Sequence, residues 1–318
     1  MSKLLHSGIR RYIRSYVFWI CVIATTALGM FSSYSSRLNE FDDMYIMTEF
    51  LIFGVVISWF VGREKDEGVV RNKVIAGHTK GSIFLSELIL AVCVCVFLFL
   101  IYAVAFAIFN GYVFEVLSIG YIVKIFVGFL LINISIATIM VVITCLIPRR
   151  AISGIINLLL VFAMVMVAYE LNSQLDIPEY YRTREMKEVV YTDENGNKYT
   201  VWEDDYTDKY ELNPQYLRGT TRKIFEIFRA VLPYGQVINY DSFLGFYIGY
   251  EWYNPATGEY EKKLPTGMTE EIAQLMPEWV ESYEDAKENM TVFPFYSIGL
   301  ITVVSGLGYY LYKRKDIK

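Results

Sequence analysis

Long apolar runs alternate with short charged segments along most of the chain. A helix needs about 20 mostly apolar residues to cross the hydrocarbon layer of a membrane, and six runs reach this length. They are centred on residues 16–30, 44–62, 83–110, 125–148, 151–169 and 289–312. The pattern predicts a polytopic α-helical membrane protein with six transmembrane helices.

The segment between the fifth and sixth runs, residues 172–292, has a different pattern. Alternating apolar and polar residues predict a hairpin over 187–203, turning at Asn195-Gly196, and a second over 247–263. Between them, residues 221–232 place apolar side chains on one helical face before Pro233, and an acidic helix follows Thr269 and breaks or kinks at Pro277. Abundant aromatic and β-branched residues favour a folded α+β domain over a linker.

Basic residues predict which side of the membrane each loop occupies, because cytoplasmic flanks collect Lys and Arg. With the amino terminus inside, the inner segments hold 15 such residues, whereas the short outer loops hold only Arg37 and Lys124. We therefore expect both termini to be cytoplasmic and residues 172–292 to be extracellular. The expected location is a cell membrane, as a multi-pass protein of a bacterial plasma membrane.

Composition agrees with this division. The 318 residues are 54% hydrophobic with a mean hydropathy of +0.34, too apolar for an ordinary soluble protein. The net charge of -5 is an average over two compartments, since residues 172–292 alone hold 23 acidic and 12 basic residues. The predicted organisation is an interfacial helix over 1–15, spans one to five over 16–171 with a cytoplasmic loop at 63–82, the extracellular domain, and span six with its tail over 293–318.

The first 15 residues are basic and amphipathic. The long apolar run that follows lacks a clean small-residue cleavage site, so a cleaved signal peptide is disfavoured. We expect a helix on the inner leaflet whose cations reach lipid phosphates; the alternative is a frayed tail that only sets orientation. The membrane-interface residues are Lys3, Arg10, Arg11 and Arg14.

Catalytic motifs are absent from the sequence. There is no phosphate-binding G-x-x-x-x-G-K-[ST] loop and no G-x-S-x-G elbow, so no ATPase or hydrolase site is expected in this chain. His6 and His78 stand apart from other ligand types, and all four cysteines fall inside predicted spans. The outer acidic run lacks calcium-loop spacing. We expect no metal site, no cofactor and no enzyme activity of its own.

The loop between spans two and three contains a short helical pattern over residues 67–76, which Gly77 ends. Its apolar residues and its cations could dock into a groove on a soluble partner, or the helix could simply lie on lipid; physical chemistry alone leaves both open. The loop has a fixed order of residue types. The acidic Glu64 comes first, then Gly68, then the basic pair Arg71 and Lys73, and Gly77 closes the segment.

This order resembles the coupling segment of ABC-2 type transporter permeases, with Ser86 and Glu87 opening the next span. The six spans and the basic amino-terminal helix are similar too, whereas many members of that family have only short re-entrant helices in place of residues 172–292. The resemblance implies contact with a separate ATPase through Glu64, Gly68, Val70, Arg71, Asn72, Lys73, Val74, Ala76 and Gly77.

Four polar residues fall within the predicted spans. Glu49 and Glu87 lie near span ends, where they could snorkel or meet water, and Asn133 and Asn157 lie deeper, where interhelical hydrogen bonds are the commoner role.

The resemblance implies a permease that pairs with a second copy or a sister permease, within lipid, and exports a peptide, an antibiotic-like or a lipid-like molecule. ATP and Mg would be bound by the partner ATPase subunits, and no nucleic acid is expected. The alternative is a membrane receptor or regulatory subunit that senses a ligand through its outer domain.

Overall fold

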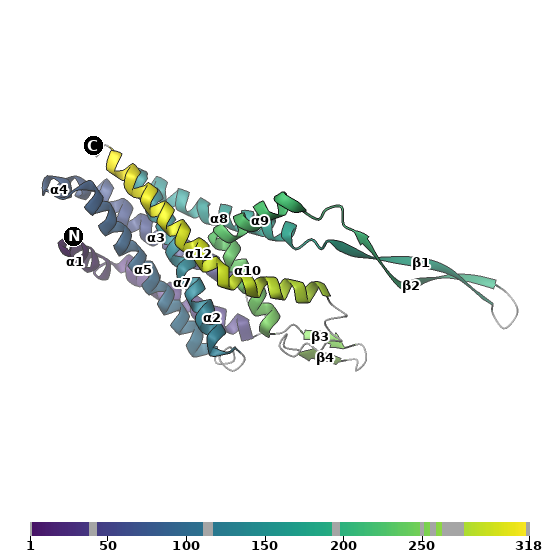
Figure 1. Ribbon diagram of the computed structural model, residues 1–318. Helices are drawn as coiled ribbons and strands as arrows, with labels where there is room; N and C mark the ends of the chain where they lie inside the picture. Colours follow the sequence, from purple (N-terminus) through teal and green to yellow (C-terminus); the bar gives the residue numbers. More distant parts are fainter. Residues whose placement is uncertain are drawn as a thin grey trace.

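Six long helices form one bundle (Figure 1). The computed structural model describes residues 2–37, 43–110, 117–192, 198–248, 251–254, 259–262 and 277–315. Within these residues, six helices are long and apolar enough to cross a membrane, which confirms the prediction of a polytopic helical architecture. They are α2 (Tyr16–Arg37), α3 (Met44–Asp66), α5 (Lys80–Phe109), α7 (Ile119–Leu146), α8 (Arg150–Leu175) and α12 (Pro277–Arg314).

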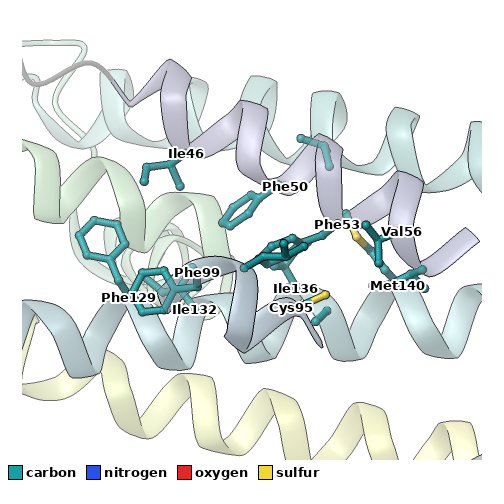
Figure 2. Close-up of a cluster of buried hydrophobic side chains, with 14 of the residues drawn as sticks. Ile46, Phe50, Phe53, Val56, Cys95, Phe99, Phe129, Ile132, Ile136 and Met140 are labelled. Atoms are coloured by element: carbon teal, nitrogen blue, oxygen red, sulfur yellow. The ribbon is translucent and has the colours of Figure 1, made fainter. Parts of the chain in front are cut away.

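The centre of the bundle is packed by α3, α5 and α7. Figure 2 shows Phe50 and Phe53 of α3 turned toward Ile132 and Ile136 of α7, with Phe99 of α5 beside them. All five side chains are buried. Lipid tails are as apolar as these residues, so close packing between helices, rather than escape from water, stabilises this core.

Two ends of the bundle can be distinguished (Figure 1). Both termini, α1 (Ser2–Ile13) and the short α4 (Val69–Ile75) lie at one end, here called the α4 end. The opposite end carries a long two-stranded ribbon of β1 (Tyr180–Thr192) and β2 (Lys198–Leu212), and is here called the ribbon end.

Helix α1 is a formed amphipathic helix, as expected, and not a frayed tail. Tyr12 is 2% exposed and its ring stacks on Phe60 of α3 with centroids 3.8 Å apart. Gly8 lies against Leu90 of α5, while Ile13 remains half exposed. The helix is therefore anchored to the bundle by one face and presents apolar side chains along another.

The β ribbon is longer than the sequence pattern predicts. Tyr180 pairs with Leu212 and Thr192 with Lys198, with one irregularity between Thr183 and Glu185. The predicted Asn195-Gly196 turn lies outside the described residues. The second hairpin is present as β3 (Glu251–Asn254) and β4 (Glu259–Lys262).

Two helices follow the ribbon, where the sequence predicts one. Helix α9 (Gly219–Val231) matches the predicted helix, and Phe228, on its apolar face, is 61% exposed. Pro233 does not lead into a loop but begins a second helix, α10 (Pro233–Ile248). Tyr240 of α10 is fully buried, with its ring 5.2 Å from that of Phe129 on α7.

Helix α10 therefore belongs to the bundle core, in contact with α7, α8 and α12. The independent α+β extracellular domain predicted over residues 172–292 is not confirmed, because its described parts divide between a projecting ribbon, a small hairpin and a helix inside the bundle. Thr269 lies outside the described residues. Pro277 is the first residue of α12, in keeping with the preference of proline for a first helical turn; the acidic stretch predicted before it lies outside the described residues.

Candidate coupling site

Helix α4 is a single short helix set between two backbone reversals. Gly68 precedes it with a φ of 68°, and Gly77 follows it with a φ of 89°. Both values lie in the left-handed region that favours glycine. Thr79 then caps the next helix, since its hydroxyl accepts a hydrogen bond from the Ser82 amide at 3.2 Å. The chain thus leaves α3, forms about two turns and enters α5 within a defined loop.

A buried ion network fixes α4 to the bundle. Lys73 Nζ lies 2.8 Å from a carboxylate oxygen of Glu87 on α5 and also pairs with Glu64 on α3. Arg11 of α1 pairs with the other oxygen of Glu64, and its Nη2 lies 3.8 Å from Glu87. The side chains of Glu64 and Glu87 are only 4% and 6% exposed. Two cations therefore balance two carboxylates among four helices.

This network changes two expectations from the sequence. Glu87 was expected to snorkel or meet water, but it is buried and paired. Arg11 was grouped with Lys3, Arg10 and Arg14 as a ligand for lipid phosphates, but it contacts Glu64. Nothing is described of the Lys3 side chain.

The residues that the resemblance assigns to coupling divide into two sets. Glu64, Val70 and Lys73 face the bundle, where the first two are buried. The exposed set comprises Arg71, Asn72, Ala76 and Gly77, with Gly68 and Val74 intermediate. Ile75, which is outside the assigned group, is 73% exposed, the largest apolar surface on α4. The helix therefore offers a surface of mixed charge and apolar character.

Two lysines tie neighbouring helices to the carboxyl end of α7. Lys65 at the end of α3 donates hydrogen bonds from Nζ to the carbonyls of Thr144 at 2.6 Å and Ile147 at 3.0 Å. Lys315, after α12, donates to the Leu146 carbonyl at 2.6 Å. A cation is favourable where unpaired helix carbonyls and the helix dipole converge. Burial lowers the pKa of the Lys315 ammonium.

Sequence reasoning counted Lys65 and Lys315 only as markers of orientation. Both lysines lie at the end of a predicted helix, and this position in the sequence could have indicated that they cap a neighbouring helix.

The deeper polar residues have separate partners. Asn157 donates from Nδ2 to Ser58 at 3.1 Å and to Thr144 at 2.9 Å, so the expected interhelical hydrogen bonds are confirmed. Asn133 instead donates to the Phe129 carbonyl of its own helix at 2.8 Å, so its interhelical assignment was wrong. Glu49 is fully buried, and neither carboxylate oxygen has a hydrogen-bond partner among the described residues; its expected contact with water was wrong.

At the ribbon end, Asp43 joins three helices, a contact that the sequence did not indicate. Tyr169 of α8 and Tyr234 of α10 both donate to its carboxylate, at 2.7 and 3.0 Å. Nearby, burial raises the pKa of the Asp176 carboxyl against the opposing effect of Arg229, and burial lowers the pKa of Arg229. Asn172 Oδ1 accepts from Arg229 at 3.5 Å.

Metal-ligating side chains and cysteines are the remaining candidates for chemistry. No group of three or more His, Cys, Asp or Glu side chains there could hold a metal ion. The four cysteines are free thiols on α2, α5 and α7.

Comparison with known proteins gives no assignment: no protein-family model, no curated protein and no solved structure matches this chain.

Proposed function

We propose that this chain is the transmembrane permease subunit of an ATP-driven exporter of the ABC-2 type. The observation that carries the proposal is α4, a short helix bounded by Gly68 and Gly77, anchored through Lys73 and exposed through Arg71 and Ile75. A helix fixed on one side and open on the other can transmit movement of a soluble partner to the bundle. The α4 end is then cytoplasmic.

In this mechanism, ATP binding closes two partner ATPases and shifts α4 as a unit. Because Lys73 pairs with Glu64 and Glu87, the shift acts on α3 and α5 together. ATP changes the equilibrium of the bundle only through its differential affinity for the two states. ATP and Mg are bound by the partner, and a second permease copy or a sister permease completes the transport pathway.

For the cargo, we propose a cationic amphipathic peptide or drug-like molecule. The outer segment, residues 172–292, carries 23 acidic and 12 basic residues, and its negative field would concentrate cations at the ribbon end. Since α10 is part of the core, the test must spare it. Residues 182–210 hold eight of the acidic and five of the basic residues, so deleting only this segment should weaken export of, or immunity to, cationic peptides in part; unchanged handling would refute a role of the ribbon in attracting the cargo.

The ATPase contact is tested by purifying the full chain from its native membranes and measuring the ATP hydrolysis that purifies with it. Arg71→Glu combined with Ile75→Ser should abolish it, because both side chains are exposed on α4. Arg149→Glu is the matched control, an exposed cation on the next loop at the α4 end. If no ATPase purifies with the unaltered chain, the exporter proposal fails.

A receptor or regulatory subunit is the second candidate. The β1–β2 ribbon extends well away from the bundle, as a ligand-sensing element would (Figure 1). Binding of an outer ligand without any associated ATPase would favour this function.

A further inference from the structure

A cavity of about 600 Å³ lies at the α4 end, between α1, the start of α2, α3 and α4. Its polar lining includes Arg11, Arg14, Arg63, Glu64, Glu67 and Lys73. Four cations and two carboxylates line the cavity, and Glu87 next to it also pairs with Arg11 and Lys73, so the charge in excess is that of one cation, Arg14. Such a wall favours an anionic ligand.

The carboxylates do not use up the cationic donors. Glu64 is shared by Arg11 and Lys73, and Glu67 accepts from Arg63 at 2.5 Å in an exposed pair. Arg14 has no carboxylate partner among the described residues. The Nε and Nη2 atoms of Arg11 are buried without a hydrogen-bond acceptor there. The cavity thus retains unsatisfied guanidinium donors.

The start of α2 adds a second source of positive potential. Ser15 and Tyr16 line the cavity, and Tyr16 is the first residue of this 22-residue helix. The amide groups of a first helical turn have no intrahelical acceptor and are therefore available to an anion. A phosphate group combines the charge and the several acceptor oxygens that these donors require.

The surroundings of the cavity favour a lipid as the source of such a phosphate group. Apolar side chains follow from the cavity along the outside of α2, where Trp19, Ile20 and Ile23 are 51%, 59% and 69% exposed. Trp19 donates to the Ile13 carbonyl at 2.9 Å, and tryptophan is enriched at the level of lipid headgroups. Acyl chains could lie along this surface while the headgroup enters the cavity.

We propose that this cavity binds the headgroup phosphate of one anionic phospholipid, with Arg14 and Arg63 as its principal ligands and Arg11 behind them. The site is independent of the exporter proposal. Because Arg11 and Lys73 also hold the ion network, an occupied site would stiffen α1 and α4 against each other. Membrane composition would then influence the position of α4.

The test uses the full chain in lipid nanodiscs, released for native mass spectrometry, with phosphatidylglycerol and phosphatidylcholine as probes. The unaltered chain should retain one phosphatidylglycerol, preferred about tenfold or more over phosphatidylcholine. Arg14→Gln with Arg63→Gln should remove this preference. The control pair Arg10→Gln with Arg71→Gln removes the same charge at exposed positions outside the cavity and should retain it.

Three results would overturn the proposal. Equal retention of the two lipids would show that the cavity does not select an anion. Equal losses in the variant and control pairs would show attraction to the surface as a whole. Displacement of phosphatidylglycerol by glycerol phosphate at matched concentration would assign the site to a soluble phosphate rather than a lipid. Arg14→Lys keeps the charge at a position whose side chain has no carboxylate partner among the described residues, so this variant should keep the preference for phosphatidylglycerol.

Discussion

Glu64 makes the closest contacts in the ion network, since it lies nearer than Glu87 to both Arg11 of α1 and Lys73 of α4. Glu64→Gln should lower stability by about 3–5 kcal/mol, because breaking a buried ion pair leaves uncompensated charge behind. Thermal unfolding in detergent measures the change.

Glu67→Gln is the matched control for Glu64. Glu67 lies one turn away, is half exposed and, among the residues that the structure describes, pairs only with Arg63. Exposed pairs contribute about 0–1 kcal/mol, so this variant should unfold close to the unaltered protein. Equal losses of stability in the two variants would mean that the buried pairs of Glu64 contribute no more than the exposed pair of Glu67.

Asp176 gives a pH-dependent prediction at the ribbon end. Burial raises the pKa of this carboxyl in the folded state, so its ionised form destabilises the fold at neutral pH and protonation relieves the cost as pH falls. Asp176→Asn should therefore raise the melting temperature at neutral pH. The gain in melting temperature should shrink as the pH falls through the raised pKa of the folded state. It should be lost near about pH 4, the usual pKa range of an aspartate.

Glu170→Gln serves as the comparison for Asp176. Glu170 is an exposed carboxylate near the same end of α8. Its substitution should show no gain at neutral pH. A gain for Asp176→Asn that grows on acidification would contradict the assignment of a raised pKa.

Helix α4 depends on its two flanking glycines. Gly68 and Gly77 have positive φ, and an added Cβ would meet nothing within 4 Å at either position. Substitution by alanine should therefore cost backbone strain alone, about 1–2 kcal/mol for each residue. The change should appear in thermal unfolding and, if α4 couples to an ATPase, as reduced ATP hydrolysis in the purified complex.

Gly306→Ala is the control for this pair. Gly306 lies within α12, and there too an added Cβ would meet nothing within 4 Å. Without a positive φ, alanine should cause no loss of stability. Losses of the same size at Gly306 would remove the conformational argument for α4.

The elements differ in how far the sequence could predict them. The six spans follow from apolar length alone, and α4 follows from a helical pattern with a closing glycine. Helix α10 was missed because Gln236, Asn239 and Asp241 interrupt its apolar pattern, and burial of the first two depends on partners in other helices. Ser297, for example, donates to Gln236 at 2.9 Å.

The ion network shows the same limit at longer range. The resemblance selected Glu64 and Lys73 as coupling residues, but Arg11 pairs with Glu64 across 53 positions of the sequence. No pattern in one segment reveals a contact of that separation. The charge of each residue was readable, whereas its partner was set by how α1 packs on the bundle.

Across the whole molecule, the ribbon should be separable from the bundle. Strand β1 packs on β2, and Tyr181 lies opposite Glu211 where the two strands leave the helices. Replacing residues 182–210 by an Asn-Gly turn should leave the melting temperature unchanged, because the β1–β2 ribbon projects away from the bundle (Figure 1). A large decrease would show that the ribbon supports the bundle.

The orientation of the molecule decides whether α4 can meet an ATPase. Cations gather at the α4 end, including Lys80, Arg149 and Lys313, and from this distribution of basic residues we expect the α4 end to be cytoplasmic. Ala76 and Thr200 are exposed at opposite ends. Each is changed to cysteine in a chain whose natural cysteines are replaced by serine or alanine.

A membrane-impermeant maleimide should label Thr200→Cys in intact cells and Ala76→Cys only after permeabilisation. If both positions were labelled only after permeabilisation, the cysteine variants would be misinserted in the membrane. Protease protection of the loops in the unaltered chain checks this. Labelling of Ala76→Cys in intact cells would place α4 outside. In that orientation no cytoplasmic ATPase could reach Arg71 or Ile75, so the exporter proposal would fail. The ribbon would then lie inside the cell, so a receptor function through an outer ribbon would fail as well.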